Sequence, residues 1–223
     1  MTVTERSYGQ YCGVARALDL VGERWALLVV RELLLGPRRF TDLQQGLPGV
    51  STNVLAARLR GLEGAGVVRR ATLPPPAASA VYELTDYGRD LGPIVQALGR
   101  WGARTLGPRE PARQALRSRW LALALRAFFH PESALGVSAD YEVRLRDGAF
   151  RLAVRDGEVE VAEAPAPGAE TVLEADDDTL VGLLAGELDP RSARESGVVV
   201  VAEGAGRDLE RFVELFRFSA PRP

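Results

Sequence analysis

The chain has 223 residues, of which 46% are hydrophobic and 26% charged, a balance typical of a soluble globular protein that excludes disorder over most of its length. One cysteine and one histidine exclude an internal disulfide and a conventional zinc cluster, so we expect no metal and no cofactor. No apolar run reaches the ~20 residues of a membrane span and the start lacks a secretory pattern, so we expect a cytoplasmic protein without a membrane partner.

Charge is divided unevenly along the chain. Residues 1–106 carry 13 arginines against 9 acidic residues, a net charge of +4. Residues 107–223 carry 15 arginines against 21 acidic residues, a net charge of −6. This asymmetry predicts that the first half alone faces an anionic partner.

The first half begins with three predicted helices. A helix over 13–21 carries an apolar stripe at helical spacing, formed by Val14, Ala17, Leu18 and Val21. Residues 25–35 are apolar on most sides, which indicates a buried helix that ends at Gly36 and the proline after it. A short helix over 40–45 then leads into the turn "GLPG".

A longer helix follows this turn. Ser51 is its expected N-cap, because a serine hydroxyl can accept a hydrogen bond from an unpaired N–H of the first turn. Gly64 and Gly66 are expected to end it. Its buried face is predicted to consist of Leu55, Leu59 and Leu62.

A β-hairpin and a last helix complete the first half. The arms of the hairpin are "VVRRATL" (67–73) and "AVYEL" (80–84), and the proline loop between them is its tip. Thr85 is then expected to cap a long helix over 86–106. This helix carries an apolar ridge that needs a partner, formed by Leu91, Ile94, Val95, Leu98 and Trp101.

Helices followed by a hairpin form the element order of a winged helix-turn-helix, which lays one helix in the DNA major groove. The helix after Ser51 is the candidate recognition helix, because small and polar side chains at its start allow close approach to base edges. Neighbouring arginines can contact phosphates. Each contact adds about −0.9 to the slope of the logarithm of the association constant against the logarithm of salt concentration, here called the salt slope. The predicted DNA-binding residues are Arg38, Arg39, Thr41, Ser51, Thr52, Asn53, Ala57, Arg58, Arg60, Arg69 and Arg70.

Residues 12 to about 104 resemble the HxlR family of winged-helix transcriptional regulators, which is related to the MarR group. The resemblance rests on "GERW", "LLLGPRRFTDL", "LPGVS", "LAARLRGLEGAGVVR" and "YELTDYG", together with a cysteine ahead of the first helix. It implies a homodimer, held by its first and last helices, that binds pseudo-palindromic double-stranded DNA. The partner of the ridge over 91–101 is then the same helix of a second subunit.

The wing tip and Cys12 are the two places where the family pattern bears on function. Similar proteins carry basic residues at the wing tip, whereas "PPPAASA" has none, so Arg69 and Arg70 are expected to replace them. Cys12 occupies the position at which some relatives have a thiol that senses oxidants or electrophiles. A sensing thiol must be exposed and shifted toward the thiolate, and the alternative is a small buried side chain.

The second half begins after a linker, since "TLGPREPARQ" (105–114) is rich in proline, glycine and charge. We expect a helix over 113–129 and then three alternating strands, "YEVRLRDG", "AFRLAVRDG" and "EVEVAEA", joined at two Asp-Gly pairs. A fourth strand, "TVLEA", precedes an aspartate-capped helix that carries Leu180, Leu183 and Leu184. A buried strand, "VVVVAEG", and a helix over 208–218 close the chain.

This order resembles the sterol carrier protein-type lipid-binding domain over roughly residues 113–218. The resemblance implies an apolar ligand held between a sheet and its helices. The candidate ligand-binding residues are Trp120, Leu123, Phe128, Phe129, Leu183, Phe212 and Phe216. For each of them an ordinary core position is the alternative.

The sequence therefore predicts an α+β protein: a winged helix-turn-helix domain over 1–106, a linker over 107–112 and an α+β sterol-carrier-like domain over 113–223. The predicted function is a homodimeric DNA-binding regulator modulated by an apolar small molecule or by redox chemistry. The alternative is a lipid or small-molecule carrier whose first domain only dimerises. An enzyme is not expected, because no catalytic constellation is found around His130 or the serines.

Overall fold

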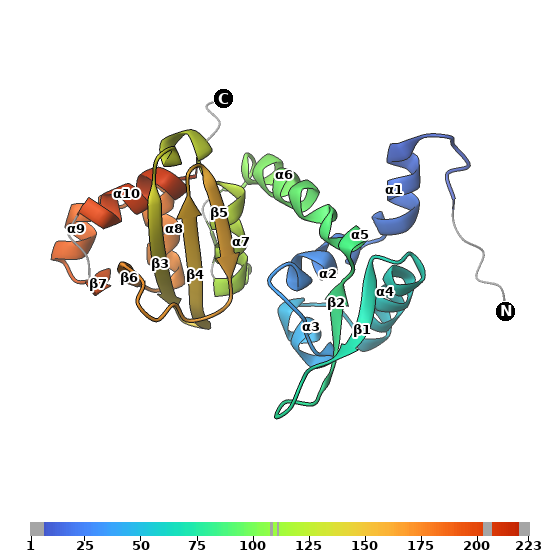
Figure 1. The fold of residues 1–223 in the computed structure, drawn as a ribbon. Helices are drawn as coiled ribbons and strands as arrows, with labels where there is room; N and C mark the ends of the chain where they lie inside the picture. Colours follow the sequence, from blue (N-terminus) through green and yellow to red (C-terminus); the bar gives the residue numbers. More distant parts are fainter. Residues whose placement is uncertain (1–6, 108, 111, 203–206, 219–223) are drawn as a thin grey trace. The chain divides into compact units, whose positions relative to one another are not determined.

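The computed structural model describes residues 7–107, 109–110, 112–202 and 207–218 (Figure 1). The chain divides into two compact units, Met1–Val95 and Gln96–Pro223. In the described residues between 104 and 117 there is no helix or strand, and the predicted linker over 107–112 lies there. The predicted domain bounds themselves stay a prediction.

The first unit contains helices and one hairpin. Its elements are α1 (Gly13–Val21), α2 (Ala26–Leu33), α3 (Phe40–Gly46), α4 (Thr52–Gly64), β1 (Val68–Thr72), β2 (Ala80–Leu84) and α5 (Asp86–Arg89). β1 and β2 pair antiparallel, and the loop between them extends beyond the helices in Figure 1. The core lies between α2, α3, α4 and the base of the hairpin, with buried side chains that include Val29, Val30, Leu43, Leu55, Leu59 and Leu84.

Local sequence explains α4. Ser51 Oγ accepts a hydrogen bond from Val54 N at 3.4 Å, which confirms the predicted cap. Gly64 is the last helical residue and Gly66 has a φ of +70°, a backbone conformation that glycine adopts without strain. The predicted buried face is confirmed, because at most 2% of each of its residues, Leu55, Leu59 and Leu62, is exposed.

The prediction of one continuous helix over 86–106 is wrong. Thr85 does cap it, since its Oγ accepts from Gly88 N at 3.0 Å, but the chain forms two helices, α5 and α6 (Leu91–Ala103). Pro93 accounts for the break at Asp90. A proline has no N–H to donate to the carbonyl of Arg89, four residues earlier, and its ring clashes with that carbonyl.

The apolar stripe predicted for the helix over 13–21 is more exposed than expected. In α1 the buried residues are Ala15 and Val21, whereas Val14 is 69% and Leu18 44% exposed. The α1 stripe therefore faces mostly outward in the single chain.

Within the described residues, no helix is long and apolar enough to cross a membrane.

The second unit is built on a five-stranded sheet with the order β5-β4-β3-β6-β7. β3 and β6 are parallel, and the other neighbouring pairs are antiparallel. Figure 1 shows α7, α8 and α10 on one face of this sheet. The elements are α7 (Ser118–Ala127), the 3-10 helix η1 (Pro131–Ala134), β3 (Ser138–Leu145), β4 (Gly148–Arg155), β5 (Glu158–Ala162), β6 (Thr171–Glu174), α8 (Asp177–Ala185), α9 (Pro190–Glu195), β7 (Val200–Ala202) and α10 (Arg207–Phe216).

Two predictions for the second unit need correction, and two short helices were not predicted. The first helix begins at Ser118 rather than at 113, because Arg109 Nη1 and Glu110 N donate to the carbonyl and the side chain of Gln114 and hold the preceding segment outside the helix. The valine run forms a short edge strand with Val200 51% exposed, not a buried strand. η1 and α9 were not expected, since neither carries an apolar period long enough to be recognised.

The strand turns follow the predicted chemistry with one difference. Asp156 and Gly157 form the turn between β4 and β5, both with positive φ, as a two-residue hairpin of this type requires. In the β3–β4 turn the two loop residues are Arg146 and Asp147, and Gly148 already pairs with Leu145. Asp176 caps α8, accepting from Thr179 N at 2.7 Å.

Candidate nucleic-acid interface

The outward face of α4 carries a stripe of small and polar side chains. Asn53, Ala57 and Arg60 follow one another at positions i, i+4 and i+7, so they lie on one side of the helix, away from the buried leucines. Asn53 and Arg60 are exposed and Ala57 is half-buried. The stripe therefore offers an amide, a methyl group and a guanidinium to whatever the helix contacts.

The start of α4 is tied to the helix before it. Gln44 Nε2 donates to Thr52 Oγ1 at 2.9 Å, which links the last turn of α3 to the first turn of α4. Ser51 and Thr52 are exposed, as is Thr41 at the start of α3. The hydroxyl groups of the predicted interface thus lie at the surface, and the Thr52 hydroxyl also links α4 to α3.

Arg58 lies in a different place from the other predicted contacts. It follows Leu55 by three residues and precedes Leu62 by four, so helical spacing places it at the border of the buried face. Its Nη1 lies 3.2 Å from Glu23 Oε2, and its side chain is 26% exposed. Arg58 therefore braces α4 against the segment before α2, and its role as a phosphate contact stays a prediction.

The segment before α3 is joined to the wing. Arg38 N donates to Tyr82 O at 2.9 Å and Tyr82 N donates back to Arg38 O at 2.8 Å, so this residue extends the hairpin sheet by one bridge. Burial lowers the pKa of Arg38, opposed by the charges of Asp42 and Glu32. Arg39 is exposed, and its Nε donates to Ser79 Oγ in the hairpin loop at 3.0 Å.

Both wing arginines have acidic partners that sequence reasoning missed. Arg69 Nε lies 2.7 Å from Glu83 Oε1, and Arg70 Nε lies 3.0 Å from Glu63 Oε1. The Arg70 guanidinium also lies over the Tyr82 ring, 5.5 Å from its centroid. The hairpin register would have identified Glu83, because it stands directly opposite Arg69.

Cys12 is exposed at the N-cap position of α1. The backbone N–H groups of Ala15 and Val14 at the start of α1 lower the pKa of its thiol below the ordinary value. A buried thiol, the alternative considered for this residue, is therefore wrong. Exposure and a lowered pKa are the two properties that thiolate chemistry requires.

Apolar side chains are exposed on α6 as on α1. Ile94 is 52%, Leu98 45% and Trp101 71% exposed, while Leu91 and Val95 pack partly against the first core. Tyr8 and Tyr11, just before α1, are exposed as well. Large apolar groups exposed at helical spacing mark an interaction face rather than scattered surface residues.

The candidate ligand residues of the second unit are buried or half-buried. Leu123, Leu183, Phe212 and Phe216 are buried, whereas Trp120, Phe128 and Phe129 are half-buried. The Phe212 and Phe216 rings pack at a tilt with their centroids 4.8 Å apart, and Tyr141 lies edge-on to both. This packing fits the core alternative as well as a lining role.

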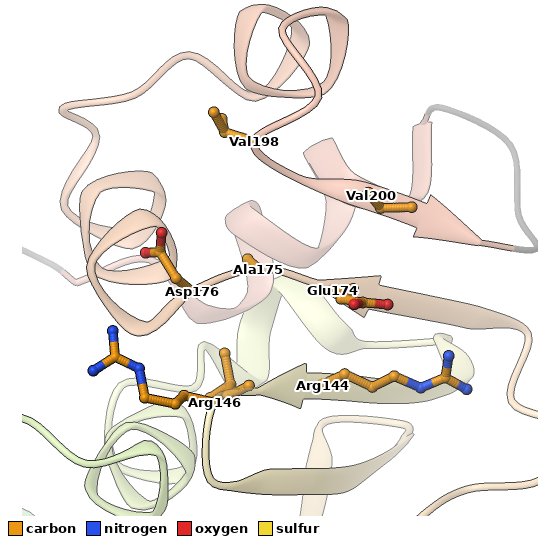
Figure 2. A pocket seen from close by; sticks show the side chains of 8 residues that line it. Arg144, Arg146, Glu174, Ala175, Asp176, Val198 and Val200 are labelled. Carbon is orange, nitrogen blue, oxygen red and sulfur yellow. The ribbon is translucent and has the colours of Figure 1, made fainter.

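A pocket of about 390 Å³ lies elsewhere in this unit, and none of the seven candidates lines it. Figure 2 shows two arginines and two acids around it, with valine side chains on the opposite side. Its lining residues are Arg144, Leu145, Arg146, Glu174, Ala175, Asp176, Val198 and Val200. Among the residues that the structure describes, no group of three or more His, Cys, Asp or Glu side chains is placed to hold a metal ion.

Comparison with known proteins concerns the first half of the chain. The family model described as HxlR-like helix-turn-helix matches residues 20–110. The HTH-type transcriptional regulator YvaP of Bacillus subtilis is 38% identical over 93 residues, which cover 42% of this chain and 86% of that protein. The HTH-type transcriptional regulator sll1512 of Synechocystis is 38% identical over 95 residues, covering 43% of this chain and 70% of its own length.

Among solved structures, the redox regulator HypR in its reduced form is similar at 30% identity and a TM-score of 0.38, covering 41% of this chain and 91% of its own. The two sequence relatives are transcriptional regulators, not enzymes. YvaP is matched over most of its length. Residues 20–110, which the family model matches, contain α2, α3, α4, the β1–β2 hairpin, α5 and α6. The chain belongs to the HxlR-like helix-turn-helix family.

Proposed function

We propose that the protein is a homodimeric transcriptional regulator that lays α4 of each subunit in the major groove of a pseudo-palindromic operator. The observation that carries this proposal is the outward stripe of Asn53, Ala57 and Arg60, directed away from a leucine face that is fully used by the core. An asparagine can bond an adenine edge in two places, and alanine permits close approach to a thymine methyl.

Phosphate contacts are proposed for residues around this helix. Ser51 and Thr52 place hydroxyl groups at the start of α4, and Arg39 and Thr41 are exposed around the start of α3. Arg60 lies two turns into α4, where a guanidinium reaches either a guanine edge or the groove wall. The half-buried Arg38 contributes mainly through the backbone bridge that joins α3 to the wing.

The dimer is proposed to form through α1 and α6. Val14 and Leu18 on α1, and Ile94, Leu98 and Trp101 on α6, expose apolar area at helical spacing. Burying such area releases about 25 cal/mol per Å². A two-fold symmetric pair then presents two copies of α4 to half-sites about one helical turn of DNA apart.

The second unit is proposed to bind an apolar effector between its sheet and the helices on one face. Support comes from the resemblance to sterol carrier-type domains and from the aromatic cluster of Tyr141, Phe212 and Phe216. An effector changes DNA binding only if it binds the two states of the dimer with different affinity. The effector site is therefore a separate proposal from the DNA site.

Selection of bound sites from random duplex DNA tests the regulator proposal. The full chain is expected to enrich an inverted repeat whose half-sites are about 10 base pairs apart, centre to centre. Repeating the selection with a lipid extract shows whether an apolar compound changes the enrichment. Failure to enrich any sequence in either condition would favour the carrier alternative and contradict the regulator.

Cys12 is proposed to regulate DNA binding through its thiolate. Because its pKa is lowered, alkylation by N-ethylmaleimide at pH 7 is expected to be faster than for a cysteine with an ordinary pKa. Alkylation is expected to change the duplex affinity of the wild type by ~10-fold or more. Cys12→Ser should bind the duplex as the untreated wild type does and should not respond, and an equal response of both proteins would contradict the proposal.

A further inference from the structure

The two arginines of the wing are adjacent in β1 and point to opposite faces of the hairpin, yet each meets a glutamate. Arg69 stands directly opposite Glu83 of β2 in the hairpin register, and their side chains form an ion pair at 2.7 Å. Arg70 pairs instead with Glu63 in the last turn of α4. The positive charge that the sequence assigns to the wing is therefore balanced within the protein.

The two pairs differ in how firmly the arginine is held. Arg70 makes two hydrogen bonds to Glu63, from Nε at 3.0 Å and from Nη2 at 3.4 Å, and its guanidinium also lies over the Tyr82 ring. Hydrogen bonding to Glu63 raises the pKa of Arg70. These contacts make Arg70 a positioning residue that joins the wing to the end of α4.

Arg69 is held by a different arrangement. Its hydrogen bond to Glu83 engages Nε, and a guanidinium carries four further N–H donors on its two Nη atoms. The Arg69 side chain is 63% exposed, whereas the Glu83 side chain is 22% exposed. The arginine thus extends outward from a carboxylate that lies beneath it, which is a suitable position for meeting an incoming phosphate.

We propose that Glu83 is an internal competitor for DNA at the wing: Arg69 exchanges the Glu83 carboxylate for a backbone phosphate when the duplex binds. Two charges closer than the Debye length of ~10 Å are not fully screened at ordinary salt. A carboxylate that remains beside Arg69 therefore both holds the guanidinium and repels the phosphate. Glu83 would keep the affinity of the wing for DNA below the value that Arg69 alone would give.

This inference rests on the proposed DNA-binding function, and Glu83→Gln tests it in the full chain. The amide keeps the size and one acceptor oxygen of the glutamate but removes its charge. The variant is expected to bind the duplex enriched by selection about three- to fivefold more tightly than the wild type in 100 mM salt, the scale of an exposed ion pair. Fluorescence anisotropy with a labelled duplex measures this change.

Two further variants separate exchange from a simple change in net charge. Glu160→Gln removes an exposed carboxylate from β5 of the second unit and is expected to leave the affinity unchanged. Arg69→Ala is expected to weaken binding and to reduce the salt slope by about 0.9. In the Arg69→Ala background, Glu83→Gln must raise the duplex affinity by a smaller factor, since there is no longer a guanidinium to release.

The outcomes are distinguishable from one another. If the wild type binds no duplex, the proposed function fails and not only this inference. If the wild type binds but Glu83→Gln binds equally or more weakly with an unchanged thermal unfolding midpoint, the competitor role is contradicted. An equal gain in Glu160→Gln, or an undiminished gain in the Arg69→Ala background, would also overturn it.

Discussion

Replacing Leu98 and Trp101 together by aspartate is expected to split the proposed dimer into monomers and to lower operator affinity by ~100-fold or more, because two linked half-site contacts become one. Both side chains are exposed in the single chain, Leu98 by 45% and Trp101 by 71%, so neither supports its own core. The charges should therefore act on the interface between subunits rather than on folding. Light scattering coupled to size exclusion gives the mass, and circular dichroism checks the fold.

A matched control for this variant lies in the second unit. Leu135 is 69% exposed, and Leu135→Asp introduces the same chemistry at a similar degree of exposure. It is expected to remain dimeric with wild-type affinity. A dimeric Leu98→Asp/Trp101→Asp protein with unchanged affinity would contradict the assignment of α6 to the interface.

Arg60→Glu is expected to lower duplex affinity by roughly two orders of magnitude, because it places a like charge against the phosphates at the centre of the interface. Arg60 is exposed on α4 and lies on the side away from Leu55, Leu59 and Leu62. The thermal unfolding midpoint should therefore stay close to that of the wild type. Anisotropy titrations and thermal scans measure the two quantities on the same samples.

The neighbouring Arg58 provides a contrast within the same helix. Arg58→Ala removes the brace to Glu23 and is expected to lower the unfolding midpoint, with a smaller loss of affinity than Arg60→Glu. Arg151→Glu, at an exposed position of β4, makes the same change of net charge as Arg60→Glu and should leave DNA binding unchanged. If Arg58→Ala lowered the duplex affinity more than Arg60→Glu does, the roles assigned to these two arginines would be contradicted.

Local patterns predicted the parts of the interface that depend on local physics. The spacing of Leu55, Leu59 and Leu62 identified the buried face of α4, and Ser51 and Gly64 marked its ends, because caps and helical periods act within a few residues. The same rules predicted the hairpin. Pro93 carried the signal for the break between α5 and α6, and the apolar ridge on either side of it obscured that signal.

Features that depend on tertiary contacts could not be predicted in the same way. The Arg58–Glu23 pair joins residues 35 positions apart, and the Arg69–Glu83 pair becomes visible only once the hairpin register is known. In the second unit, the contacts of Gln114 with Arg109 and Glu110 delay the start of α7 despite a helical pattern before Ser118. Ion pairs and loop contacts of this kind leave no periodic signal in the sequence.

The salt dependence of duplex binding tests the central claim, that the outer face of α4 and the arginines around it bind DNA. If each subunit of the proposed dimer neutralises two or more phosphates, the logarithm of the association constant should fall linearly with the logarithm of salt concentration, with a slope of about −3.6 or steeper. Arg60→Glu should give a shallower slope. A wild-type affinity that does not change between 50 and 300 mM salt, or no duplex binding at all, would contradict the account.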